Sequence, residues 1–125
     1  MIHLLLVALG GAIGAGARHL VNLSAMRAFG LGFPVGTLFV NIVGSFAMGL
    51  AAGYFAFRGE GGMALRLFLT TGILGGFTTF SAFSLETVLL FERGQVGLAA
   101  LYVAGSVAGS VAGLLAGLAL MRGMQ

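Results

Sequence analysis

Four long stretches of this sequence carry no acidic residue, lysine or arginine, and they limit what the chain can fold into. They run over residues 1–17, 28–57, 67–85 and 94–121, each near or above the ~18 apolar residues of a spanning helix. Only 7% of the chain is charged and 59% is hydrophobic, against about 25% charged in an ordinary soluble domain. This composition excludes a soluble globular domain and a disordered chain.

We therefore predict an all-α membrane protein with four transmembrane helices in one domain that covers residues 1–125. Short, turn-rich connectors place these helices at roughly residues 2–29, 34–57, 63–91 and 95–121. Pro34 suits the first turn of the second helix, where its missing N–H removes no helical hydrogen bond.

The arginines give almost no orientation signal. The face that holds both termini carries three: Arg58, Arg66 and Arg122. The other face carries Arg27 and Arg93, and also Arg18 if that residue lies toward the same side. Because a fixed orientation needs an excess of positive charge on one side, the balance favours insertion both ways. Two opposed copies would then form an antiparallel, dual-topology homodimer, similar to inverted-repeat transporters. The alternative is that one orientation narrowly prevails.

Glycines recur at helical spacing in the first and last predicted spans. In the last span they stand four apart, at Gly105, Gly109, Gly113 and Gly117. In the first span, Gly10 and Gly14 have the same spacing. Small residues in this pattern let helix backbones approach closely in a membrane, so we predict tight helix packing at both places.

Polar side chains form two stripes inside the spans. Thr37, Asn41 and Ser45 are four residues apart in the second helix, and so share one face. The fourth helix has the same arrangement at positions Tyr102, Ser106 and Ser110. We interpret the stripes as the walls of one narrow polar path, the alternative being interhelical hydrogen bonds that only pack the helices together.

The third span contains a poor helix-forming segment near its middle, Gly75-Gly76-Phe77-Thr78-Thr79. We predict that the helix is broken there. The freed carbonyls of Gly75 and Thr78 could then hold a small cation, and freed N–H groups could attract an anion. The alternative is a continuous helix with threonine hydroxyls bonded back to the preceding turn.

Two phenylalanines, Phe80 and Phe83, follow the predicted break. The edge of a phenyl ring is electropositive, so edges that face a narrow path favour an anion without holding it strongly, as conduction requires. Arg18, in the first span, either attracts anions at a vestibule or pairs with a carboxylate or a helix C-terminus.

Nothing in the sequence points to an enzyme. The chain has no cysteine and no aspartate, and its two histidines, His3 and His19, lack metal-ligand spacing. A phosphate-binding loop is also missing from the sequence.

Three segments, at residues 10–18, 36–46 and 75–83, resemble the three signatures of the Fluc family of bacterial fluoride channels, in the family's order. The resemblance extends over essentially the whole chain. It implies an antiparallel homodimer with two pores that let cytoplasmic fluoride leave the cell passively, relieving fluoride toxicity. It also implies a location in the cell inner membrane and a sodium ion at the dimer centre.

The resemblance assigns roles to individual residues. The backbone carbonyls of Gly75 and Thr78, from both subunits, would hold the sodium ion, and Arg18 matches the family's first-helix arginine at the vestibule. The pore residues it implies are Phe80, Phe83, Asn41, Tyr102, Ser106 and Ser110, with Thr37, Thr79 and Ser81 as additional hydroxyls. His19 departs from the family, where many members have an aromatic residue after the arginine.

Two other functions compete with a channel. A small dual-topology exporter of cations would need a mid-membrane carboxylate, and the first span has none, while Glu86 lies toward the end of the third. A structural membrane-assembly subunit would use the glycines and polar stripes for packing alone.

Overall fold

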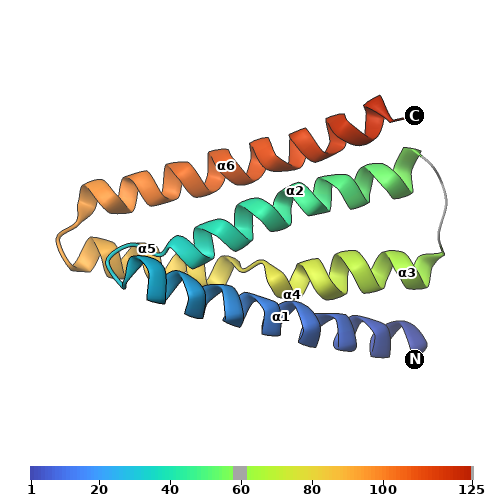
Figure 1. Cartoon of the computed structure of the whole chain (residues 1–125), viewed down its shortest axis with the longest axis horizontal. Helices are drawn as coiled ribbons and strands as arrows, with labels where there is room; N and C mark the ends of the chain where they lie inside the picture. Colours follow the sequence, from blue (N-terminus) through green and yellow to red (C-terminus); the bar gives the residue numbers. More distant parts are fainter. Residues whose placement is uncertain (58–61, 125) are drawn as a thin grey trace.

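The computed structural model describes residues 1–57 and 62–124. It confirms four helices long and apolar enough to cross a membrane in this part of the chain, over Ile2–Phe29, Val35–Ala56, Met63–Glu92 and Val96–Gly123 (Figure 1). Three spans are single helices: α1 (Ile2–Phe29), α2 (Val35–Phe57) and α6 (Val96–Gly123). The other consists of α3 (Met63–Leu67), the π-helical η1 (Phe68–Leu74), α4 (Gly75–Phe77) and α5 (Phe80–Glu92).

Glycines and a proline set several of the helix ends. Gly30, at φ 77°, follows α1, and its N–H donates to the Met26 carbonyl over 2.9 Å. Gly94, at φ 80°, follows α5; both angles lie in the left-handed region that glycine adopts readily. Helix α2 begins at Val35, one residue later than predicted, and Pro34 supplies a carbonyl to the Leu38 N–H over 3.2 Å.

The third span has extended backbone between α4 and α5. Thr78 has φ −92° and ψ 159°, and Thr79 has φ −153° and ψ 126°. The N–H and the hydroxyl of Thr78 both donate to the carbonyl of Leu74, over 3.1 and 3.0 Å. The hydroxyl of Thr79 accepts from the Ala82 N–H over 3.2 Å, so this threonine is the N-cap of α5.

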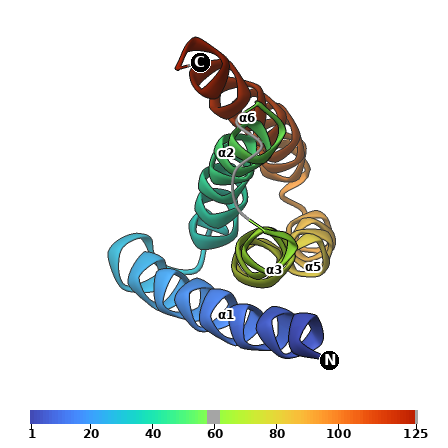
Figure 2. The same ribbon diagram turned by 90° about the vertical axis from the view of Figure 1, so that its right-hand side faces the viewer.

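The spans are arranged with α1 and α6 on opposite sides of α2 and the third span (Figure 2). Helix α6 packs mainly on α2, and α1 packs mainly on η1 and α4. On α6, a Cβ added at Gly117 would overlap the Phe46 carbonyl oxygen, and one at Gly113 would lie 3.2 Å from the Ile42 oxygen. The predicted close packing is thus confirmed for Gly109, Gly113 and Gly117, whereas a Cβ at Gly105 would meet open space.

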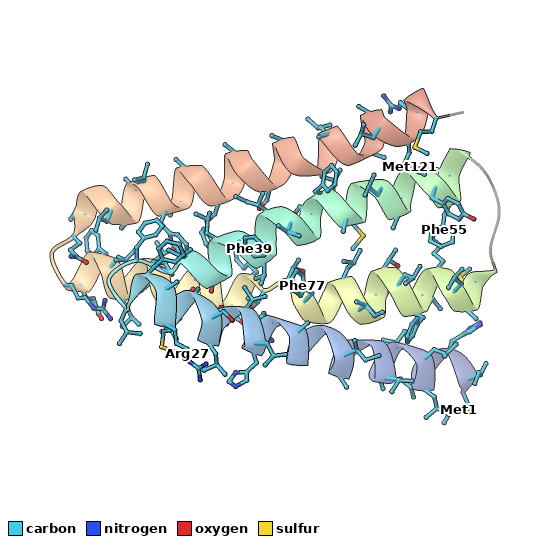
Figure 3. The ribbon with its side chains drawn as sticks, in the orientation of Figure 1. Met1, Arg27, Phe39, Phe55, Phe77 and Met121 are labelled. Atoms are coloured by element: carbon cyan, nitrogen blue, oxygen red, sulfur yellow. The ribbon has the colours of Figure 1, made fainter. Side chains whose placement is uncertain are left out.

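Large apolar side chains remain exposed along the outside of the helices (Figure 3). Leu5 is 60% exposed and Leu101 62% exposed, although both lie within spans. Such a surface suits lipid or another protein and not water. The N-terminus and the end of α6 lie at the same end of the molecule, as an even number of spans requires (Figure 1). Arg58, one of the arginines in the charge balance, lies outside the described residues.

Candidate functional site

A groove of about 320 Å³ lies where α2, the Thr78–Thr79 segment, α5 and α6 meet. Its polar and aromatic lining consists of Asn41, Ser45, Thr78, Thr79, Phe80, Phe83, Ser106 and Ser110. The structure therefore brings together residues of both predicted polar stripes, one threonine of the predicted cation site and both phenylalanines. Because these residues come from three separate regions of the sequence, 41–45, 78–83 and 106–110, the groove exists only once the spans have packed.

The side chain of Asn41 forms two hydrogen bonds to one residue of the interrupted span. Its Nδ2 donates to the Thr79 carbonyl over 3.0 Å, and its Oδ1 accepts from the Thr79 N–H over 2.8 Å. Asn41 thus lines the groove while its amide satisfies backbone groups that have left helical geometry.

Ser106 presents the most unusual polar atom of the groove. It is only 5% exposed, and its Oγ is buried with no hydrogen-bond partner among the described residues. Buried hydroxyls nearly always have a partner, so such an exception needs an explanation. Ser110 lies one turn further along α6 and lines the same groove. The groove is therefore lined by two serines, and the hydroxyl of one of them has no acceptor among the described residues.

The two phenylalanines are adjacent but differ in exposure. Their ring centroids are 5.5 Å apart, with an angle of 46° between the planes. Phe80 is 77% exposed, whereas Phe83 is half-buried and lies 5.2 Å from the ring of Tyr102. Packing thus fixes the ring of Phe83, whereas the ring of Phe80 is exposed in the single chain.

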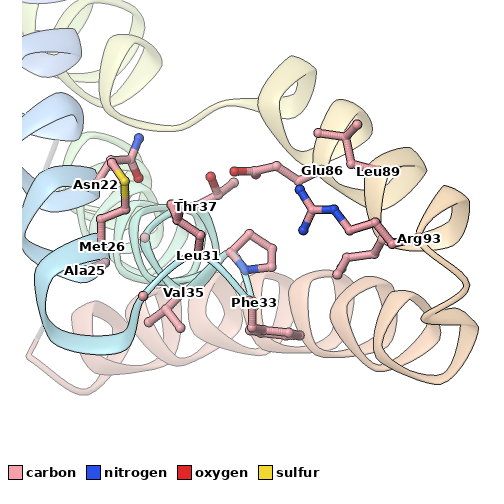
Figure 4. Close-up of a pocket in the computed structure, with 15 residues that line it drawn as sticks. Asn22, Ala25, Met26, Leu31, Phe33, Val35, Thr37, Glu86, Leu89 and Arg93 are labelled. Carbon is pink, nitrogen blue, oxygen red and sulfur yellow. The ribbon is translucent and has the colours of Figure 1, made fainter.

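A second cavity, of about 360 Å³, lies toward the loop between α1 and α2 (Figure 4). Thr37, Glu86 and Arg93 line it, so Thr37 does not face the same groove as Asn41 despite sharing its stripe. Tyr102 is fully buried, and its hydroxyl donates to Glu86 Oε1 over 3.0 Å while its ring packs on Phe83. Tyr102 therefore contacts a residue of each cavity.

Glu86 is a polar contact of the site that the sequence did not assign. An acidic residue inside an apolar span was a sufficient signal to suspect a role. Its partner Tyr102 is 16 positions away in the chain, so only the packing of α5 on α6 reveals the pair.

Besides Thr37 and Tyr102, three more of the predicted residues lie outside the groove lining. Ser81 is exposed, with its hydroxyl 3.2 Å from that of Thr79. Gly75 is exposed at the start of α4. Arg18 lines neither described cavity, and its Nε donates to the Gly76 carbonyl over 3.1 Å. This bond matches the helix C-terminus interpretation of Arg18, because Gly76 is in α4 next to its last residue.

Comparison with known proteins places the chain in a family. The model of "CrcB-like protein, Camphor Resistance (CrcB)" matches residues 5–118, which is nearly the whole chain. The chain belongs to the CrcB family. The Fluc resemblance seen in the sequence is this same family, because its curated relatives carry the FluC name.

Several CrcB relatives match this chain from end to end. One from Nitrobacter hamburgensis, named "Fluoride-specific ion channel FluC 2", is 60% identical over 97% of this chain and 98% of its own length. A Rhodopseudomonas palustris relative named "Fluoride-specific ion channel FluC" is 62% identical over 96% of this chain and 97% of its own. One from Agrobacterium fabrum, with that same name, is 55% identical over 99% of both.

Proposed function

We propose that this chain is a fluoride-selective passive ion channel of the inner membrane that lets cytoplasmic fluoride leave the cell. The observation that carries the proposal is Ser106, a residue that lines a groove inside the membrane-spanning region and whose buried hydroxyl has no partner among the described residues. The names of relatives about 60% identical over the full chain support fluoride as the ion.

The groove has the chemistry to pass a small anion. Hydroxyls of Ser106 and Ser110 can donate hydrogen bonds that replace water around the ion. The ring edges of Phe80 and Phe83 add a weak positive potential. Among the described residues, no lysine or arginine lines this groove, so an anion is solvated there without being trapped, as conduction requires. Release of fluoride then follows its own gradient and needs neither ATP nor a coupled ion.

Tyr102 would separate the groove from the cavity that contains Glu86. The anion would pass this tyrosine to reach Thr37, which lines the second cavity. Ser81 and Thr79, joined by their hydroxyls, would border the path beside the phenylalanines.

We further propose that the functional unit is an antiparallel, dual-topology homodimer with two pores. Balanced arginines support both orientations. The exposed ring of Phe80 supports a second copy, because a phenyl group that forms a pore wall needs a facing surface. Lipid would cover the remaining apolar faces.

A sodium ion at the centre of this dimer fits the residues present. The helical run ends at Phe77, and carbonyls in the last turn of a helix lack helical donors. Such oxygens suit a hard cation, and the carbonyls of Gly75 and Thr78 from both copies would hold it. When bound, it would supply a fixed positive charge near the pores.

Aromatic substitution tests the channel proposal. Fluoride efflux would be measured from liposomes that contain wild type, Phe80→Ile, Phe83→Ile or the control Phe91→Ile, an exposed position on the same helix. We expect Phe80→Ile and Phe83→Ile to assemble but conduct poorly, and the control Phe91→Ile to conduct like wild type. Altered assembly with unchanged flux per dimer would overturn the pore role and favour a packing role.

A further inference from the structure

We propose that Arg18 and Asn41 are positioning residues that clamp residues 76–79 from two different helices, Arg18 at Gly76 and Asn41 at Thr79. The clamp would determine where α5, and hence Phe80 and Phe83, stands relative to the groove. This inference rests on the proposed channel function for its effect on ion flow, but its structural content does not depend on that function.

The geometry of Asn41 selects an extended residue as its partner. A side-chain amide has a donor and an acceptor on neighbouring atoms, and Asn41 places them on the carbonyl and the N–H of Thr79, at 3.0 and 2.8 Å. In a helix these two backbone groups point in opposite directions along the axis, so one amide cannot reach both. The pair of bonds therefore stabilises the extended conformation of Thr79 against the helical one.

Arg18 acts on the other side of the same segment. Its Nε donates to the carbonyl of Gly76, two residues before Thr78, over 3.1 Å. A positive charge at a helix C-terminus is favourable because the last carbonyls carry partial negative charge. The bond also gives a half-buried guanidinium within a span a polar partner.

The glycines of α1 make this contact possible. Gly10, Gly14 and Arg18 are four apart and share one face of the helix. A Cβ at Gly10 would lie 2.9 Å from the Gly72 Cα, and one at Gly14 would overlap the Ile73 carbonyl oxygen. Two turns of α1 thus lie directly on the backbone of η1, and the next turn brings Arg18 to the end of α4.

The clamp sets the start of α5. Thr79 is the N-cap of that helix through its hydroxyl, which accepts from the Ala82 N–H over 3.2 Å. Phe80 is the first residue of α5 and Phe83 lies one turn later. Fixing Gly76 and Thr79 therefore fixes the direction in which α5 leaves the break, and with it the two rings.

Hydrogen–deuterium exchange of the purified dimer tests the clamp without any measurement of ion flow. In Asn41→Leu we expect the Thr79 amide to exchange roughly fivefold to tenfold faster, because its acceptor is gone. In Asn41→Asp that amide keeps its acceptor and stays protected. Arg18→Met would accelerate exchange over residues 76–80, and Arg18→Lys would do so less. The control Arg27→Met, an exposed arginine of the same helix, would change nothing there.

Fluoride efflux from the same preparations tests the functional consequence. Arg18→Met and Asn41→Leu should each lower flux per folded dimer. The flux of the double variant should be only slightly below that of the single variant with the lower flux, because both substitutions act on one segment. Multiplicative losses would mean separate roles and would overturn the clamp, as would unchanged exchange in folded single variants. Should Asn41→Leu or Arg18→Met fail to fold, Asn41→Ala, which also lacks the acceptor, and Arg18→Lys, with its smaller expected acceleration, replace them. If exchange is altered in the variants but the wild-type protein passes no fluoride, the clamp is supported and the channel proposal is overturned.

Discussion

The hydroxyl of Tyr102 on α6 donates to Oε1 of Glu86 on α5 over 3.0 Å, and the tyrosine ring is fully buried. Through this bond and its ring contact with Phe83, Tyr102 connects the groove beside the interrupted span to the cavity at the α1–α2 loop. A fully buried side chain at this place separates the two cavities, and its hydroxyl proton is held by Glu86.

The bond between Tyr102 and Glu86 predicts unequal effects of two conservative substitutions. Tyr102→Phe removes the donor and should lower the free energy of unfolding by about 1–2 kcal/mol, since a half-buried carboxyl loses a partner. Glu86→Gln keeps an acceptor and should lower it less. Unfolding titrations in mixed micelles measure both. A Tyr102→Phe variant as stable as wild type would contradict the structural role of this bond.

The unpartnered hydroxyl of Ser106 predicts a loss of function without a loss of stability. Ser106→Ala removes a buried polar atom that has no described partner, so stability should stay equal or rise slightly. Fluoride flux should fall by roughly tenfold, equivalent to about 1.4 kcal/mol in the barrier.

Ser84→Ala is the matched control for this substitution. Its hydroxyl donates to the Phe80 carbonyl over 3.0 Å, and it does not line the groove. We expect its flux to equal that of wild type in the same liposome assay. Equal flux in both alanine variants would show that Ser106 is not part of the path.

The packing of α1 predicts different outcomes for two glycines of that helix. Gly14→Ala would place a Cβ against the Ile73 carbonyl, and overpacking of this kind destabilises by about 1–3 kcal/mol. Gly16→Ala meets nothing within 4 Å and should be neutral or slightly stabilising. The fraction of each variant that survives heating as monodisperse protein measures the difference. Equal survival would contradict the close contact between α1 and η1.

The helices were largely predictable because the length of each apolar stretch and the charged residues, glycines and proline at its ends act locally. The first span was predicted at 2–29 and the structure has Ile2–Phe29, since charge, glycine and the loss of apolar residues mark its ends. The second begins one residue after the predicted position, because Pro34 precedes the helix and supplies a carbonyl. Such features need no knowledge of neighbouring helices.

The grouping of polar residues was predictable only in part. Helical spacing placed Asn41 and Ser45 on one face, and both line the groove. The same spacing placed Thr37 with them, but it lines the other cavity. The position of a stripe residue along α2 relative to Tyr102 decides which cavity it lines. That position depends on how α6 packs on α2.

Individual contacts across spans were beyond the sequence. The bonds from Arg18 to Gly76 and from Tyr102 to Glu86 join residues 58 and 16 positions apart. The seven-residue η1 also shifts the residues that follow it around the helix, because a π-turn has a different repeat from the α-helix. A period of 3.6 residues read from the sequence cannot anticipate such a shift.

Anion efflux from liposomes that contain the purified protein is the direct test of fluoride-selective conduction. The liposomes are loaded with fluoride or chloride, valinomycin provides a potassium shunt, and an ion-selective electrode follows release. We predict rapid fluoride release with negligible chloride release from the wild-type protein. No fluoride release from well-folded protein, or equal release of both anions, would contradict a fluoride-selective channel.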